Sequence, residues 1–93
     1  MEPFIDSQDP KINDILIKLT PLFNNEEFKE ILHDNNKNEN HVHKIGFFKG
    51  RKSFTLNKEK IYVCLKDSNS EYYEDNMLIH VILHELTHTI VDD

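Results

Sequence analysis

The chain has 93 residues, a formal net charge of −6 and one cysteine, Cys64. This length fits one domain, which we predict to span residues 1–93, and the lone cysteine excludes an intrachain disulfide. The shares of hydrophobic residues, 38%, and of charged residues, 30%, are typical of a folded globular protein and exclude a disordered tail.

Positive charge is concentrated in the middle of the chain. Seven of the eleven basic residues lie between Lys44 and Lys66, where Glu59 is the only acid. From Asp67 to Asp93 there are seven acids and no Lys or Arg. The acidic total does not favour general nucleic-acid binding. The basic middle leaves two interpretations, a local contact with an anionic partner or a solvated hairpin, and we favour the hairpin.

The first ten residues hold three acids and lack the basic start and apolar run of a secretory signal peptide. The longest apolar stretch, residues 77–86, is interrupted by His80, His84 and Glu85 and is unsuited to spanning a membrane. We therefore expect an intracellular protein, cytoplasmic or nuclear, that is not secreted and has no membrane partner.

The first forty residues predict two helices and a loop. Residues 10–23 place apolar side chains at helical spacing. Asp9 can cap this helix, Pro10 suits its first position, and Pro21 ends or kinks it. The pattern repeats from Glu26 to His33 and predicts a second short helix. Residues 34–40 are polar and rich in asparagine, which predicts a loop.

From residue 41 onward the apolar period changes to that of strands. Residues 42–48, 53–56 and 60–65 are strand candidates, and residues 57–59 fit the turn of a hairpin between the last two. The run Ile-Tyr-Val-Cys-Leu at 61–65 is apolar on both faces, so we expect this strand to be buried on both sides. After a loop at 66–71, Asp75 is predicted to cap a last helix that begins at about Asn76.

The last helix carries the pattern His-Glu-x-x-His. His84 and His88 are four residues apart, so they project from one face and can bind one Zn²⁺ ion. Glu85 lies to the side, where its carboxylate can reach a zinc-bound water. Zinc lowers the pKa of such a water to about 7, and Glu85 would take the proton and pass it to the leaving amine. The alternative is a surface helix with fortuitous histidines.

Other polar residues are weaker candidates. His80 lies one turn before His84, but positions 80 and 88 are about 12 Å apart along a straight helix. We therefore favour a structural or supporting role for His80. His41 and His43 could bind metal from one side of a strand, although a solvated pair is commoner. Three tyrosines could stabilise an oxyanion or could simply be rim or buried aromatics: Tyr62, Tyr72 and Tyr73.

Two segments, SFTLNKEKIYVCLKD and YYEDNMLIHVILHELTH, resemble the WLM/SprT-like zincins, most closely the small predicted metallopeptidases of large DNA viruses. The resemblance covers roughly residues 51–93. It implies an α+β, zincin-like fold in which a small antiparallel or mixed sheet packs on the active-site helix, with helices at the N-terminal end.

The resemblance also implies an activity, that of a zinc metallopeptidase acting on protein or peptide substrates. In this pattern His84 and His88 are zinc ligands and Glu85 is the catalytic base. The predicted strand Lys60–Leu65 would lie near the substrate cleft, where a peptide could add as an extra strand.

The chain departs from this pattern at its C-terminal end. Such families place a third ligand beyond the second histidine, and this sequence stops five residues after His88. Asp92 could approach a metal only if the helix unwinds. We therefore expect either a fragment of a longer protein or a truncated, inactive member. The alternative function is a non-catalytic metal-binding or interaction domain derived from a zincin.

Overall fold

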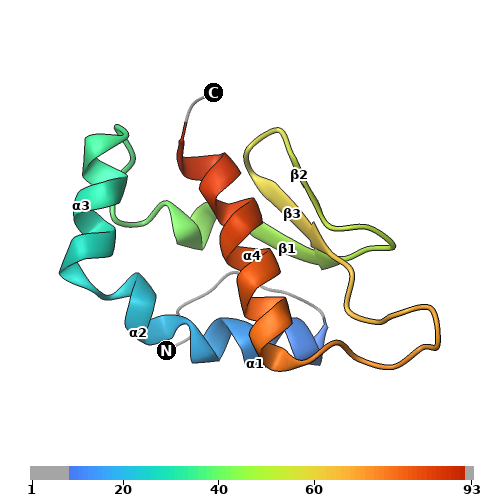
Figure 1. The fold of residues 1–93 in the computed structure, drawn as a ribbon. Helices are drawn as coiled ribbons and strands as arrows, with labels where there is room; N and C mark the ends of the chain where they lie inside the picture. The colour runs from blue at the N-terminus through green and yellow to red at the C-terminus, as the bar shows by residue number, and fades with distance from the viewer. Residues whose placement is uncertain (1–8, 92–93) are drawn as a thin grey trace.

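The computed structural model describes residues 9–91, which form an α+β fold (Figure 1). Its α-helices are α1 (Pro10–Lys18), α2 (Thr20–Phe23), α3 (Glu26–Asp34) and α4 (Asp75–Ile90). Its strands are β1 (Gly46–Lys49), β2 (Phe54–Leu56) and β3 (Lys60–Val63), and a 3-10 helix, Val42–Lys44, precedes β1. Within the described residues no helix is long and apolar enough to cross a membrane.

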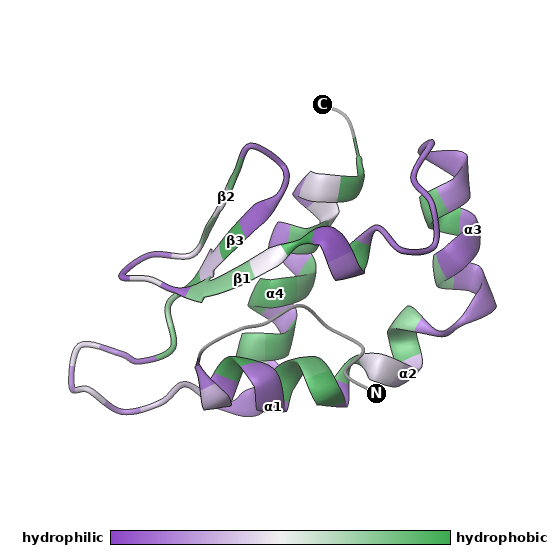
Figure 2. Ribbon diagram, turned by 180° about the vertical axis from the view of Figure 1, so that it is seen from behind, coloured by the Kyte–Doolittle hydropathy of each residue, from purple (hydrophilic) through white to green (hydrophobic). Residues whose placement is uncertain are grey.

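The strands form one mixed sheet in the order β1-β3-β2. β1 runs parallel to β3, and β2 pairs antiparallel with β3 through the predicted hairpin at residues 57–59. In Figure 1, α4 lies between the sheet and α3, and α1 runs below it. Figure 2 shows that α3 is mostly hydrophilic, whereas α1 and α4 carry most of the helical apolar residues. The main core therefore lies where α1, α4 and one sheet face meet.

The N-terminal helices form as the sequence predicts. The Asp9 side chain accepts hydrogen bonds from the backbone N–H groups of Lys11 and Ile12, at 2.8 and 3.4 Å. This caps α1, because those donors have no partner within the first turn of the helix. The helix ends at Lys18, and the separate short helix α2 holds Pro21 near its start. The predicted break at this proline is therefore confirmed.

Asp75 does not cap α4, contrary to prediction. Glu74 is the N-cap and makes no side-chain capping bond, and Asp75 is the first helical residue. Its carboxylate instead accepts a hydrogen bond from Lys11 at 2.6 Å and a second from Lys18. These two lysines lower the pKa of Asp75 from 3.8 to about 2. The Asp75 carboxylate, which the sequence predicted to be a helix cap, thus links the start of α4 to α1.

The segment after residue 41 is only partly the predicted strand. Residues 42–44 form a 3-10 turn because His41 has helical backbone angles, φ −52° and ψ −47°, and β1 begins later, at Gly46. The apolar spacing of residues 42–48 fits a turn followed by a strand as well as one continuous strand. Val42, which lies in the turn, and Phe47, which lies in β1, are both buried.

The expectation that residues 61–65 are buried on both sides is wrong. Ile61 and Val63 are fully buried on the helix-facing side, but Tyr62 points to the other face and is only half-buried. There it stacks between Phe48 and Phe54, with ring centroids 5.3 and 4.8 Å away. Aromatic neighbours, rather than a second helical layer, cover this side of Tyr62.

Candidate functional site

The helix α4 places the His-Glu-x-x-His residues relative to the sheet. Leu78, Ile82 and Leu86 recur at helical spacing and are almost completely buried. His84 and His88 lie on the other side of the helix and are exposed. In the sequence, apolar residues surround the motif on most sides, as in a helix buried under a sheet. In the structure the two imidazoles are nevertheless at the surface, and Glu85 is the member of the motif that is buried.

His84 and His88 face each other on this surface. Their ring centroids are 4.9 Å apart, and the rings meet edge to face at 89°. Side chains four residues apart on a helix are neighbours, so the helix itself sets this pairing. The predicted convergence of the two imidazoles is therefore present in the structure.

Glu85 is the buried polar member of the motif, with 9% of its surface exposed. Thr55, on β2, donates its hydroxyl hydrogen to this residue. The Thr55 oxygen lies 2.9 Å from the Glu85 carboxylate oxygen Oε1 and 3.1 Å from the Glu85 backbone carbonyl oxygen. A buried carboxylate without a hydrogen-bond donor is costly. Thr55 therefore compensates part of the burial and fixes the direction of the carboxylate.

A cleft of about 450 Å³ opens beside Glu85 and His88. One wall is α4 and the other is β2 with the following turn. At its far end Lys58 donates a hydrogen bond to the Val91 carbonyl at 3.1 Å, which ties the hairpin turn to the end of α4. The lining residues are Ser53, Phe54, Thr55, Asn57, Lys58, Glu85 and His88. The base candidate and one ligand candidate thus share one solvent-accessible space.

The residues present fit part of a zinc site. Two exposed imidazoles in contact are donors that zinc commonly takes, with Zn–N distances of about 2.0–2.1 Å. Within residues 9–91, however, no group of three His, Cys, Asp or Glu side chains is close enough to hold an ion. The described chain thus offers a two-histidine donor pair, and Asp92, the predicted approach from the C-terminal end, lies outside the described residues.

The other histidine candidates are elsewhere. His80 is exposed one turn earlier on α4. His41 is the N-cap of the 3-10 turn and His43 lies within it, so the less favoured alternative, metal binding from one side of a strand, does not apply. His41 Nε2 bonds the Thr89 hydroxyl at 3.0 Å. That hydroxyl gives its hydrogen to the Leu86 carbonyl at 2.7 Å, so His41 must be the donor.

None of the three tyrosine candidates lines the cleft beside Glu85. Tyr62 stacks on the opposite face of the sheet. Tyr72 and Tyr73 precede α4 and line a different pocket, near the other end of that helix. The structure therefore gives them no place next to the proposed base.

Sequence reasoning missed Thr55 as a site residue. A signal was present, because Thr55 is the polar residue between Phe54 and Leu56 and alternation puts it on the opposite face from both. The alternation could not predict that Glu85 is the partner of Thr55 on that face, because this depends on how α4 crosses β2.

Two relatives are similar to this chain. It is 44% identical over 59 residues to Uncharacterized protein 136R of Invertebrate iridescent virus 6, a match covering 60% of this chain and 33% of the relative. It is 46% identical over 44 residues to Uncharacterized protein 042R of Invertebrate iridescent virus 3, covering 46% of this chain and 28% of the relative. The chain thus spans about a third or less of these relatives.

Both relatives are viral proteins, and their names state no activity. No protein family matches the chain, and no solved structure matches it.

Proposed function

We propose that this chain is the zinc-binding part of a metallopeptidase that resembles the WLM/SprT-like zincins. One observation carries the proposal. A buried carboxylate, Glu85, is held by Thr55 next to two exposed imidazoles, and it opens into a cleft beside a strand. A helix that needed only to pack against the sheet would have no reason to bury a glutamate there.

His84 and His88 would hold the metal. Zinc, when bound, supplies the Lewis acidity that makes a water nucleophilic near neutral pH. The two histidines are presented by one rigid helix, so their mutual position does not depend on a loop. Ligand pairs on rigid elements keep their geometry better than ligands on loops.

Glu85 would act as the general base and then as the acid. Thr55 engages Oε1, which leaves Oε2 to accept a proton from the attacking water and deliver it to the leaving amine. A carboxylate fixed by a hydrogen bond loses less freedom when it reaches this position, and correct orientation is a large part of catalysis.

The substrate would be a protein or peptide segment lying along β2. The family resemblance implies that a peptide could add to the strand at residues 60–65, but β3 is the central strand and pairs with β1 and β2 on its two sides. β2 is one of the two edge strands of this sheet, and its residues line the cleft with Glu85. An extended peptide added at this edge would form backbone hydrogen bonds and pass the base.

A second candidate is a domain that binds metal without catalysis. It is motivated by the exposed histidine pair itself, and because residues 9–91 bring no third ligand to that pair, such a site would take its remaining ligands from outside these residues. Structural zinc sites have four protein ligands, whereas catalytic ones keep a position open to water. The two candidates differ in whether a water exchanges at the metal.

The test uses the open reading frame that contains this chain, expressed with zinc and assayed on denatured casein. We expect cleavage that stops on adding a chelator and returns with zinc. Glu85→Gln should keep the metal content and abolish turnover, since an amide cannot accept the proton. A variant of His80, His80→Ala, serves as the matched control and should retain activity. Full zinc content without cleavage would favour the non-catalytic candidate, and no zinc binding would refute both.

A further inference from the structure

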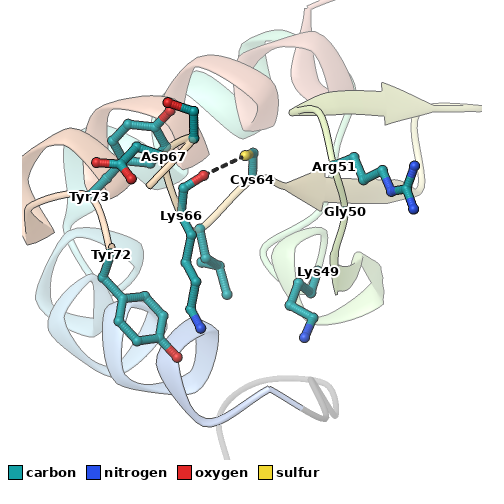
Figure 3. A pocket seen from close by; sticks show the side chains of 10 residues that line it. Lys49, Gly50, Arg51, Cys64, Lys66, Asp67, Tyr72 and Tyr73 are labelled. Atoms are coloured by element: carbon teal, nitrogen blue, oxygen red, sulfur yellow. Dashed lines mark hydrogen bonds between the residues drawn. The ribbon is translucent and has the colours of Figure 1, made fainter. Parts of the chain in front are cut away.

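A second pocket, of about 620 Å³, lies at the opposite end of the sheet from the hairpin turn (Figure 3). β1 and β3 are parallel, so the segments that follow them leave the sheet at the same edge. These two segments and the residues before α4 form its walls. The lining residues are Lys49, Gly50, Arg51, Cys64, Leu65, Lys66, Asp67, Ser68, Tyr72 and Tyr73.

Positive side chains dominate this pocket. Lys49, Arg51 and Lys66 line it together with a single acid, Asp67, so it carries an excess of two positive charges. The Asp67 carboxylate accepts hydrogen bonds from the backbone N–H groups of Asn69 and Glu71, at 2.8 and 3.1 Å, and so stabilises its own loop. Within residues 9–91 the three basic side chains form no ion pair.

Two of the three cations extend in the same direction. Figure 3 shows this for the side chains of Lys49, at the end of β1, and Lys66, in the segment after β3, whereas Arg51 turns away from them. The Tyr72 ring lies beside Lys66, whose ammonium nitrogen is 4.7 Å from the ring centroid. This cation–π contact holds Lys66 in position. An anion between Lys49 and Lys66 would remove the repulsion between their like charges.

The walls are fixed by hydrogen bonds of the loop that carries Lys66. Residues 66 and 72 form an isolated antiparallel bridge, and the Tyr73 N–H bonds the Leu65 carbonyl at 3.0 Å. The Cys64 thiol donates to the Lys66 carbonyl at 3.3 Å. A pocket whose walls are already ordered loses little conformational freedom when a ligand binds.

We propose that this pocket binds the phosphate group of a small phosphate monoester. A monoester carries a charge of about −1.5 to −2 at pH 7, which the two ammonium groups of Lys49 and Lys66 can balance. A carboxylate or the phosphodiester of a nucleic-acid backbone carries one negative charge. Lysine binds phosphate as a point charge, and the pocket volume leaves room for the organic part of the ester.

The test is a titration of the 93-residue chain with phenyl phosphate at fixed ionic strength, followed by amide NMR shifts. We expect saturable shifts around Lys49, Lys66 and Tyr72. Lys49→Met and Lys66→Met should each weaken binding by about tenfold, as expected for loss of a charge-assisted contact. Arg51→Met should have a smaller effect. Lys60→Met, a basic residue outside the pocket on the same sheet, should leave the affinity unchanged, and amide spectra establish that each variant is folded.

Three results would overturn the proposal. The first is the absence of saturable binding of phenyl phosphate. The second is equal affinity for dimethyl phosphate or for a short oligodeoxythymidylate, which would assign the pocket to phosphodiesters. The third is an equal effect of Lys66→Met and Lys60→Met. The measurement is made without zinc and does not involve Glu85, so its outcome is independent of the peptidase proposal.

Discussion

The Thr55 hydroxyl oxygen lies 2.9 Å from the carboxylate oxygen Oε1 of Glu85 and 3.1 Å from the backbone carbonyl oxygen of the same residue. Thr55 is on the edge strand β2 and Glu85 is on α4, so this contact joins the two walls of the cleft. A hydroxyl has one hydrogen, which the two acceptors must share. The contact therefore affects both how α4 docks on the sheet and where the carboxylate points.

Replacing Thr55 by valine should destabilise the protein. Valine has the shape of threonine but no donor, so the buried Glu85 carboxylate loses a partner at a cost of about 1–3 kcal/mol in the free energy of unfolding. Thr55→Ser keeps the hydroxyl and should cost clearly less. Urea unfolding of both variants measures the difference. Equal stability of Thr55→Val and Thr55→Ser would show that the hydrogen bond contributes nothing.

Zinc should bind through the histidine pair. Added zinc is expected to raise the unfolding midpoint of the 93-residue chain, since a ligand that binds only the folded state stabilises it. The double variant His84→Ala/His88→Ala should lose this response, whereas His80→Ala should keep it. The response should weaken in acid, because protons compete with the metal for the ligands. Equal zinc content in the double variant and the parent would contradict this assignment.

His41 should make stability depend on pH. Burial, with the nearby positive charges of Lys37 and Lys44, lowers the pKa of His41 below its ordinary value of 6.5, and hydrogen bonding to the Thr89 backbone only partly opposes this. The unfolded chain therefore binds this proton at higher pH than the folded chain does. Stability contributed by neutral His41 is present above pH 6.5 and is lost as the pH falls from 6.5 toward the folded-state pKa.

The matched variant is His41→Gln, which can still donate to Thr89 but does not titrate. Urea midpoints of the metal-free protein at pH 7.5 and pH 5.5 should fall more for the parent than for the variant. The other histidines are common to both proteins, so their contributions cancel in the comparison. An identical fall in both would mean that His41 does not contribute to this dependence.

Local patterns predicted much of the fold. The cap at Asp9, the break near Pro21 and the hairpin turn depend on residues close in sequence, and all three are confirmed. The roles of Asp75 and Tyr62 were predicted wrongly because each depends on residues far along the chain. Asp75 pairs with two lysines of α1, and Tyr62 stacks between residues of two other strands.

In the candidate site, too, the features set by residues close in sequence could be predicted and those set by distant residues could not. The contact of His84 with His88 follows from helical spacing alone, so the sequence could predict it. Their exposure, the burial of Glu85 and the contact with Thr55 depend on which face of α4 meets the sheet. Apolar residues lie on several sides of this helix, and they do not by themselves determine that face.

The 93-residue chain alone should be a poor peptidase. Two imidazoles hold a metal less firmly than three ligands, so a water beside Glu85 would be less well positioned, and a misplacement of about 1 Å can reduce the rate about 100-fold. The comparison is a side-by-side assay of this chain and of a longer protein that contains it on denatured casein, with and without a chelator. We expect chelator-sensitive cleavage only from the longer protein, which should also bind zinc more tightly. Equal rates would refute the need for a ligand from elsewhere and would make Asp92, which lies outside the described residues, the first residue to test as a third donor, because no described side chain joins His84 and His88 as a third ligand.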